Sequence, residues 1–493
     1  MTYESIIGLE IHIQLNTRSK VFCACPADSW GALPNTNICP VCTGLPGVLP
    51  VLNRAVIEKA VLLAAAMHCE IQPQSFFDRK NYFYPDLPKG YQITQYDAPI
   101  GRRGWFDVPM PGANGAPSGE TRHVTIQKMH MEEDAGKTKN DPLRGRRSPS
   151  GGVRLIDMNR CGVPLIEMVT GPDLRSADEA AQFLIRMRQL LRWLDVSEAN
   201  MERAHLRCDA NVSIRVVGAT ELNPKTEIKN VNSIEAVKDA IEKEIERQVK
   251  EVSAGRRVEA WTLEWDEDTQ TLKKMRSKET EADYRYFREP DLLSVIVADE
   301  WRDVILSRLP ELPLDRRDRF MEHYKLPAYD ATLLTEERSL SDYYEEAVRL
   351  CGAGGDPKTV ANWVQNEILR LINEMSITAA QLRFTPAHLA ELIKLVEAKT
   401  ITRQTAVALI PKVIATGKAP KALVEAEGLV QISGDDALRA VAQQVIAENP
   451  DQVAAYKAKP TLLKWFVGQV MKKTQGKANA QAAERILSEL LQQ

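Results

Sequence analysis

Hydrophobic positions recur with the periods of both strands and helices up to about residue 291, and with the helical period after it. Before it, β-branched and partly alternating runs predict strands at residues 6–14, 153–158 and 211–216. Apolar residues at helical spacing predict one helix from the capping-box pattern that begins at Ser176 and another that begins near Asn232. Strands and helices are therefore mixed in the first part of the chain.

Beyond residue 291 the strand patterns fade, and short amphipathic helices with polar turns follow. One is predicted to start at Thr385, a cap that is followed by a proline, and another near Asp435. The predicted fold class is α+β. It comprises a mixed sheet and helix domain at 1–293, an all-α domain at 294–408 and a helical tail at 409–493.

The composition is typical of a globular protein and limits the partners it could have. Of the 493 residues, 44% are hydrophobic and 27% are charged. The net charge of −3 excludes a uniformly basic surface, so nucleic acid would need a local basic face. No window approaches about 18 uninterrupted apolar residues, and the N-terminus carries no signal-peptide pattern. We therefore expect a cytoplasmic protein.

Four of the eight cysteines form two close pairs, Cys23-x-Cys25 and Cys39-x-x-Cys42. Disulfide frameworks belong to small secreted domains, whereas four thiolates at this spacing can converge on a metal ion. The cluster predicts a structural zinc site, because four sulfur ligands leave no position for water or substrate. The alternative is a set of buried free thiols.

Two segments place acidic residues where a hard metal ion could be held. In the strand predicted at residues 6–14, Glu10 and His12 project from the same face. Residues 132–134 are three consecutive acids, and Lys137 follows them. Such a run is unfavourable unless a cation or a phosphate is present, which favours carboxylates that hold magnesium and a lysine that binds phosphate. The alternatives are a surface Glu–His pair and a solvated acidic turn.

Polar residues also occupy alternate positions in two further strand-like segments. Asp209 and Asn211 belong to the first segment, and Glu227 and Lys229 belong to the second. A sheet face of this kind either meets solvent or lines a polar cleft. The loop at residues 77–92 collects aromatic and cationic side chains that suit phosphates and bases, although a packed tyrosine corner has a similar composition.

Lysines gather in the tail, where residues 452–480 contain no acid. They share this segment with an apolar stripe that includes Trp465 and Phe466. A helix with lysines on one side and aromatic residues on the other suits a phosphate backbone. The alternative is an ordinary amphipathic helix whose lysines are solvated.

These segments together resemble one family from end to end, the B subunits of the glutamyl/aspartyl-tRNA amidotransferases (the GatB family). The strings that carry the resemblance are Gly8-Leu9-Glu10-Ile11-His12, Asn35-Thr36-Asn37, Gly44-Leu45-Pro46-Gly47, residues 78–92, Glu132-Glu133-Asp134-Ala135-Gly136-Lys137, Asn159-Arg160-Cys161-Gly162-Val163-Pro164-Leu165, Met275-Arg276-Ser277-Lys278, Asp283-Tyr284-Arg285-Tyr286-Phe287 and Phe466-Val467-Gly468-Gln469-Val470-Met471-Lys472.

The resemblance implies an ATP-dependent carbon–nitrogen ligase that acts on mischarged tRNA. In this family the B subunit uses ATP and Mg²⁺ to phosphorylate the side-chain carboxylate of Glu-tRNA(Gln) or Asp-tRNA(Asn), and ammonia then displaces the phosphate. The ammonia comes from a glutaminase A subunit, and a small C subunit completes a heterotrimer. We expect either tRNA or both as substrates, with Gln-tRNA(Gln) or Asn-tRNA(Asn) as the product used in translation.

The resemblance also implies a structural role for each part of the chain and a chemical role for named residues. The N-terminal domain would be a cradle that carries the kinase-like activation site and the zinc knuckle, and the tail would be YqeY-like and bind tRNA. Phosphorylating a carboxylate needs a divalent ion and cations, because two anions repel. The implied residues are Glu10, His12 and Glu132 for magnesium and catalysis; Asp209, Glu227 and Lys229 for catalysis; Lys80, Tyr82, Lys89, Lys137 and Asn211 for ATP or the acyl group; Cys23, Cys25, Cys39 and Cys42 for zinc; and Lys464, Lys472, Lys473 and Lys477 for tRNA.

Two residues depart from the family pattern. Arg288 stands where proline is usual, and His205 stands where a small residue is usual. Two other functions are weighed against the amidotransferase. One is a tRNA-binding adaptor that has lost the kinase-like site, which ATP turnover would distinguish. The other is a free-standing zinc-containing ATP-dependent ligase, which would act without partner chains.

Overall fold

The computed structural model describes seven stretches of the chain. Its contacts divide the chain into two units, Met1–Pro313 and Leu314–Gln493, and each is described by itself. The finer division predicted from the sequence, with boundaries after residues 293 and 408, stays a prediction. The described stretches are residues 2–111, 117–140, 154–277, 281–352, 355–429, 435–474 and 478–492.

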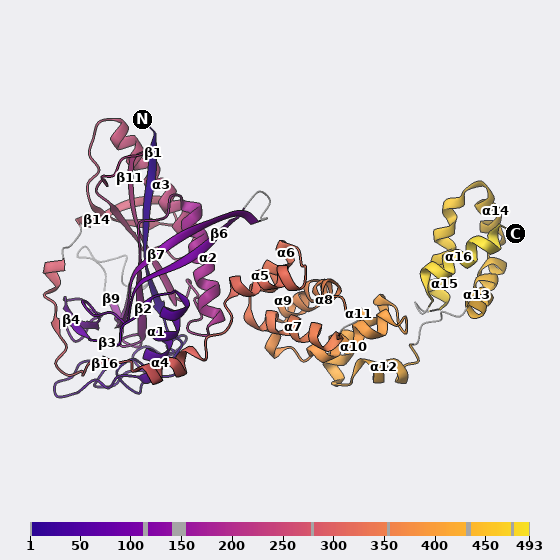
Figure 1. The fold of residues 1–493 in the computed structure, drawn as a ribbon, viewed down its shortest axis with the longest axis horizontal. Helices are drawn as coiled ribbons and strands as arrows, with labels where there is room; N and C mark the ends of the chain where they lie inside the picture. The colour runs from indigo at the N-terminus through magenta and orange to yellow at the C-terminus, as the bar shows by residue number, and fades with distance from the viewer. Residues whose placement is uncertain are drawn as a thin grey trace. The chain divides into compact units, whose positions relative to one another are not determined.

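The first unit is built on a 12-stranded sheet in the order β14-β13-β12-β11-β1-β10-β7-β5-β4-β15, with β6 on β7 and β2 on β6 (Figure 1). All pairings are antiparallel except that of β12 with β13. The strands of the sheet are β1 (Tyr3–Gln14), β2 (Glu70–Ile71), β4 (Asp78–Asn81), β5 (Tyr91–Thr94), β6 (Gly101–Pro111), β7 (Pro117–Glu133), β10 (Pro164–Thr170), β11 (Leu206–Val216), β12 (Thr226–Lys229), β13 (Trp261–Asp266), β14 (Thr271–Ser277) and β15 (Phe287–Arg288).

Two small ribbons and a set of helices complete this unit. The ribbons pair β3 (Gln74–Ser75) with β16 (Val295–Ile296), and β8 (Lys137–Asn140) with β9 (Arg154–Asp157). The helices are α1 (Arg54–Ala66), α2 (Ala177–Trp193), α3 (Ile234–Ser253), the 3₁₀ turn η2 (Glu281–Tyr284) and α4 (Asp299–Leu306).

The sheet has one apolar face and one polar face. Along β1, Leu9, Ile11 and Ile13 are buried in a hydrophobic core that also contains residues of α1, α2 and α3. Figure 1 shows α2 and α3 beside the sheet. Because successive side chains of a strand point to opposite faces, Glu10 and His12 lie on the other, polar face.

The second unit is helical. Two hydrophobic clusters form its interior: residues such as Tyr344, Trp363 and Phe384 lie in the first, and Phe466 and Val470 lie in the second. Its elements are α5 (Pro313–His323), α6 (Ala328–Leu334), α7 (Arg338–Cys351), α8 (Pro357–Trp363), the π-helical turn η3 (Val364–Ile368), α9 (Leu369–Met375), η4 (Ala379–Gln381), α10 (Pro386–Glu397), α11 (Arg403–Thr416), α12 (Pro420–Ala426), α13 (Asp435–Glu448), α14 (Pro450–Ala458), η5 (Pro460–Leu462), α15 (Leu463–Lys473) and α16 (Ala480–Leu491).

The α+β fold class and the predicted helix starts are confirmed. The Ser176 side chain caps α2 by accepting a hydrogen bond of 3.1 Å from the Glu179 backbone N–H. Thr385 caps α10 in the same way, and Pro386 occupies the first helical position. In the part of the chain that the structure describes, no helix has both the length and the apolar character needed to cross a membrane.

Candidate active site

Three neighbouring strands bring His12, Glu167 and His130 into one row on the polar face of the sheet. In the pairings of β10 with β1 and with β7, Glu167 lies opposite His12 on one side and opposite His130 on the other. The Oε2 atom of Glu167 is 3.6 Å from the His12 Nε2 atom and 3.4 Å from the His130 Nε2 atom. The register of the sheet therefore assembles residues that are far apart in the sequence.

Glu132 and Glu10 extend this row along its two outer strands. Glu132 lies two residues after His130 on β7, and its carboxylate oxygens are 4.0 Å from the His12 Nε2 atom and 3.8 Å from the His130 Nε2 atom. Among the described residues, potential ligand atoms within 4.8 Å of one another form the sets Glu10–His12–Glu167 and His130–Glu132–Glu167. Glu167 is thus common to both sets, and the predicted magnesium trio is divided between them.

The electrostatics of the row depend on how its carboxylates are surrounded. Burial and the nearby Glu167 carboxylate raise the pKa of Glu10. Burial alone would also raise the pKa of Glu167, but His130, His12 and Lys80 outweigh it and hold this pKa well below its usual range. Glu167 therefore carries a negative charge at neutral pH, and it lies where a cation would be stabilised.

The strands beside β1 carry a second polar group. Asp209 on β11 lies opposite Glu10, and Asn211 lies opposite Glu227 of β12. The Lys229 Nζ atom is 2.5 Å from an Asp209 carboxylate oxygen and 3.6 Å from a Glu227 oxygen. Burial alone would lower the pKa of Lys229, but the two carboxylates outweigh it and raise this pKa. The four predicted residues of β11 and β12 are thus brought together beside the row.

On the other side of the row, Lys80 of β4 lies among aromatic rings. Its Nζ atom is 4.8 Å from the centre of the Tyr284 ring and 5.9 Å from that of Tyr82. The Tyr82 hydroxyl donates a hydrogen bond of 3.3 Å to the Gln92 side-chain oxygen. Because Lys80 also lowers the pKa of Glu167, its charge acts on the row. The structure therefore brings Lys80 and Tyr82 to the same face as the carboxylates.

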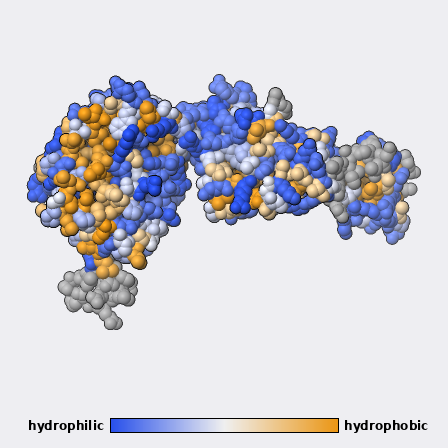
Figure 2. Space-filling model, turned by 90° about the horizontal axis from the view of Figure 1, so that it is seen from below, coloured by the Kyte–Doolittle hydropathy of each residue, from blue (hydrophilic) through white to orange (hydrophobic). Residues whose placement is uncertain are grey.

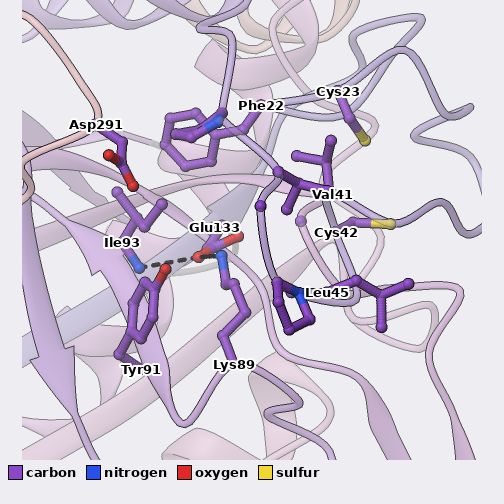
Figure 3. A pocket seen from close by; sticks show the side chains of 16 residues that line it. Phe22, Cys23, Val41, Cys42, Leu45, Lys89, Tyr91, Ile93, Glu133 and Asp291 are labelled. Atoms are coloured by element: carbon purple, nitrogen blue, oxygen red, sulfur yellow. Dashed lines mark hydrogen bonds and ion pairs between the residues drawn. The ribbon is translucent and has the colours of Figure 1, made fainter.

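Lys89 meets a different carboxylate from those of the row. It forms an ion pair with Glu133, whose Oε1 atom also accepts a hydrogen bond of 2.9 Å from the Ile93 backbone N–H. Both residues line a pocket of about 230 Å³ that Cys42 borders, and Figure 3 shows the pair between the cysteine loop and β5. A side chain at Gly44, whose φ is +70°, would overlap the Lys89 side chain. The cysteine loop and Lys89 are therefore closely packed.

Lys137 and His205 line a groove of about 400 Å³ at the end of β1. The wall of this groove includes Trp30, and the Arg203 guanidinium lies 5.0 Å from the centre of the Trp30 ring. The Gln14 backbone N–H donates a hydrogen bond of 2.8 Å to the His205 carbonyl oxygen. The unusual His205 thus borders a polar groove that begins two residues beyond His12, and Lys137 lies in this groove rather than in the row.

Arg288, the second residue that departs from the family pattern, connects β15 to neighbouring segments through ion pairs. Its Nη1 atom is 3.1 Å from an Asp78 carboxylate oxygen and 3.2 Å from an Asp97 oxygen. Its guanidinium also lies 4.3 Å from the centre of the Phe76 ring. Two ion pairs and a cation–π contact therefore hold the Arg288 side chain against its neighbours.

The four predicted zinc ligands converge in the loops before α1. The sulfur atoms of Cys23, Cys25, Cys39 and Cys42 all lie within 4.8 Å of one another. The Cys39 backbone N–H donates to the Cys42 sulfur at 3.2 Å, and a hydrogen bond from the Cys23 thiol lowers the pKa of Cys42 to about 4. A four-sulfur set at this separation fits a tetrahedral zinc ion with Zn–S bonds of about 2.3 Å.

The tail lysines lie on α15, whose apolar side is buried as predicted. Phe466 and Val470 are fully buried in the second cluster of the helical unit. Lys464 and Lys472 are exposed, while Lys473 forms an ion pair with Glu448 of α13. Lys477, also predicted to contact tRNA, lies outside the described residues.

Sequence reasoning missed two members of the row, His130 and Glu167. His130 carries a usable signal, because it lies two residues before Glu132 and a strand places such residues on one face. Glu167 lies in the run Leu165-Ile166-Glu167-Met168-Val169, which has the pattern of a buried strand interrupted by a single acid. Only the pairing of β10 with both of its neighbours shows what that acid meets.

Comparisons with known proteins agree with this architecture. The family model of the GatB/GatE catalytic domain matches residues 5–303, and that of the GatB (YqeY) domain matches residues 342–491. The B subunit of the aspartyl/glutamyl-tRNA(Asn/Gln) amidotransferase of Thermodesulfovibrio yellowstonii is 46% identical over 494 residues, which cover 100% of both chains. The corresponding B subunits of Thermotoga maritima and Brevibacillus brevis are 44% and 43% identical and cover 100% and 99% of both chains.

The first family model covers the sheet from residue 5 of β1 onward, and the second covers α13, α14, α15 and α16, which contribute to the second hydrophobic cluster of the helical unit. Identity above 40% extends along the whole chain, so the resemblance is not confined to the motifs. The chain therefore belongs to the family of aspartyl/glutamyl-tRNA(Asn/Gln) amidotransferase B subunits.

Proposed function

We propose that the row of His12, Glu167 and His130, together with Glu10 and Glu132, is the site at which ATP activates a side-chain carboxylate on tRNA. Family membership gives the wider role: the chain is the B subunit of a tRNA-dependent amidotransferase, a ligase of protein biosynthesis. The observation that supports the location of the site is the convergence of three carboxylates and two imidazoles on one face of the sheet.

A divalent cation would neutralise negative charge on the carboxylates of this row. Carboxylate oxygens are the ligands that Mg²⁺ prefers, and Glu10, Glu132 and Glu167 supply them. His12 and His130 would complete or orient the shell. When bound, Mg²⁺ neutralises charge on the transferring phosphoryl group of ATP. The side chains present therefore fit the ion that the proposed reaction needs.

The two lysines on either side of the row fit the substrates of the reaction. An oxygen of the acyl carboxylate attacks the terminal phosphorus of ATP, the bond to ADP breaks, and an acyl phosphate forms. Both reactants are anions, and the ammonium groups of Lys80 and Lys229 would hold them together on the polar face of the sheet. Ammonia then attacks the acyl carbon, phosphate leaves, and an amide remains on the tRNA.

The nitrogen nucleophile must lose a proton as the amide forms. Asp209 and Glu227 hold Lys229 between them, and they lie across from Glu10 and Asn211 respectively. We propose that one of these two carboxylates accepts the proton, because both lie on the polar face beside the row.

The four cysteines are proposed to hold a structural zinc ion. Their four sulfur atoms lie as close together as the ligands of such sites do. Four sulfur ligands also leave no open position on the ion. The loop they form borders the pocket that contains Lys89 and Glu133. A zinc ion would thus stabilise one wall of this pocket rather than take part in the reaction.

The names of the relatives, each a lettered part of an amidotransferase, imply an assembly of several chains. We propose that a glutaminase A subunit supplies the ammonia and that a small C subunit joins the complex. Apolar side chains on the first unit support a protein interface, because Leu33, Leu49 and Leu293 are 75%, 63% and 92% exposed. Figure 2 shows hydrophobic residues gathered on one side of this unit.

The tail is proposed to bind the tRNA away from the reacting end. Lys464 and Lys472 are exposed on α15, whose described residues include no acid. Lysines of this kind neutralise phosphates without reading sequence. The tRNA would then be Glu-tRNA(Gln), Asp-tRNA(Asn) or both.

A single-turnover assay tests the proposed location of the site. Glu-tRNA(Gln) and Asp-tRNA(Asn) are mixed with [γ-³²P]ATP and ammonium chloride and with the reconstituted complex that carries Glu132→Gln. Phosphate release and amidation should both fall by about 100-fold or more, while tRNA binding survives. The matched control is Glu259→Gln, which changes an exposed acid outside the sheet. Amidation near the wild-type rate in Glu132→Gln would place the site elsewhere on the chain.

A further inference from the structure

Gly468 lies in the middle of α15 without any steric reason to be a glycine. Apart from its chain neighbours and the backbone of its own helix, a methyl group added at this position would have no heavy atom within 4 Å, and the backbone there is not in the left-handed region. Glycine in a helix interior is less stable than alanine, because it loses more conformational freedom on folding. Neither packing nor backbone geometry in this helix therefore explains the residue.

The neighbours of Gly468 on the helix surface are two lysines. Lys464 and Lys472 precede and follow it by four residues, so all three share one face of α15. All three are exposed, and the exposed Thr461 lies in η5, just before the helix begins. The opposite side of the helix packs into the core through Phe466 and Val470. The exposed face thus presents bare backbone between two cations, each about 6 Å along the axis from it.

We propose that Gly468 is the point at which the sugar-phosphate backbone of tRNA approaches α15 most closely. This inference rests on the proposed tRNA role of the tail and goes further, because it assigns the contact to the residue that lacks a side chain. Charge complementarity identifies the occupant, since the described residues of α15 are basic or neutral. Lys473 is paired with Glu448, so Lys464 and Lys472 are the two cations that frame the glycine.

A side chain at residue 468 would hold the sugar-phosphate backbone of the tRNA away from α15. Ammonium groups bind phosphates through short, direct contacts, and a displacement of one or two methylene groups weakens both lysine contacts together. The same side chain would stabilise the free protein, because it enters open space and improves the helix propensity. Stability and tRNA affinity are therefore expected to change in opposite directions.

The test uses the full-length chain in its assembled complex, with an unacylated tRNA(Gln) or tRNA(Asn) transcript as the probe. In the absence of tRNA, Gly468→Ala and Gly468→Leu should both raise the Tm of the chain in the complex by about 2–4 °C. The Kd for tRNA should rise by about fivefold in the first variant and by more in the second. Gln443→Leu, which places the same side chain on the exposed face of α13, is the matched control and should leave the Kd unchanged.

Lys464→Ala and Lys472→Ala separate this inference from the function on which it rests. Each should weaken tRNA binding. Each should also reduce the slope of log Kd against log salt concentration by about one, because one phosphate contact is lost. If these variants weaken binding but Gly468→Leu binds tRNA as the wild type does, the close approach at Gly468 is overturned and the tail contact stands. If neither lysine variant nor Gly468→Leu changes the Kd, both the tail contact and this inference are overturned.

Discussion

Glu167 lies directly opposite His12 in the pairing of β10 with β1, and its Oε2 atom is 3.6 Å from the His12 Nε2 atom. The same Oε2 atom also lies close to the His130 imidazole on the next strand, so one oxygen is near both imidazoles. Glu10 and Glu132 are each close to this carboxylate but belong to different sets of potential ligands. Glu167 is therefore the residue that both sets of potential ligands share.

The first prediction concerns this residue. Glu167→Gln removes the charge shared by both ligand sets, so amidation should fall by about 10- to 100-fold and should need more Mg²⁺ for half-maximal rate. The measurement is the amidation rate as a function of Mg²⁺ concentration. Glu167→Asp keeps the negative charge on a shorter side chain, so its amidation rate should fall less than that of Glu167→Gln. An unchanged Mg²⁺ dependence in Glu167→Gln would show that the row does not hold the ion.

The second prediction concerns the cysteine cluster. Cys42→Ser, or prolonged treatment with a chelator, should remove zinc and lower the Tm of the chain by about 5 °C or more, because metal binding contributes directly to folding. Zinc content is measured by mass spectrometry together with the thermal transition. Cys351→Ser changes a buried cysteine of the second unit and should keep the zinc. Purified wild-type chain without bound metal would favour free thiols.

The third prediction compares two glycines of the same loop. Gly44 and Gly47 both have positive φ, at +70° and +86°, but only at Gly44 would a side chain overlap Lys89. Gly47→Ala should cost about 1–2 kcal/mol of backbone strain and leave amidation near the wild-type rate. Gly44→Ala should cost more and reduce amidation about tenfold, because it displaces Lys89 from Glu133.

Zinc content and amidation are measured for both glycine variants. Retained zinc in Gly44→Ala assigns its loss of activity to Lys89 rather than to the metal site. Equal activity of the two variants would mean that the Lys89–Glu133 ion pair has no part in the reaction.

The fourth prediction is a pH dependence in the helical unit. Burial alone would raise the pKa of Glu345, but Arg319 and Arg316 outweigh it and lower this pKa below the usual value. A lowered folded-state pKa stabilises the protein above the unfolded-state pKa of about 4.3, and this stability is lost as the pH falls through the folded-state value. Glu345→Gln should therefore destabilise the unit at pH 7, and the difference should shrink below about pH 4.

Because Glu345 is partly exposed, solvent screening limits the expected loss at pH 7 to about 1 kcal/mol. Urea unfolding followed by circular dichroism at pH 7 and pH 3.5 measures it. Glu346→Gln breaks a more exposed pair with Arg349 and should cause no measurable change. A pH-independent difference between wild type and Glu345→Gln would show that packing, not charge, accounts for it.

Local chemistry made part of this structure predictable. Ser176 and Thr385 cap helices where the sequence places an oxygen before an apolar helical run, because the first backbone N–H groups of a helix need an acceptor. Strict alternation likewise placed Glu10 and His12 on one face, and the short spacing of the cysteine pairs brought their sulfurs together. Each of these features is decided within a few residues of the chain.

What the sequence did not predict depends on register between distant strands. Nothing near Glu167 specifies that His12 will lie on one side of it and His130 on the other. Lys89 is close in sequence to Lys80, yet it meets Glu133 beside the cysteine loop, while Lys80 lies among the tyrosines. From residue types alone, both lysines could be predicted to contact phosphate. Only the fold shows that their surroundings differ.

The register of β1, β10 and β7 decides which side chains of these strands reach the polar face. A slip of one residue in any of these strands would turn its functional side chain toward the core and bring an apolar residue to the polar face. Glu167 would then change places with Ile166 or Met168, which are both fully buried. Such a slip would be unfavourable on both faces at once, so hydrophobic burial favours the one register that aligns the residues of the proposed site.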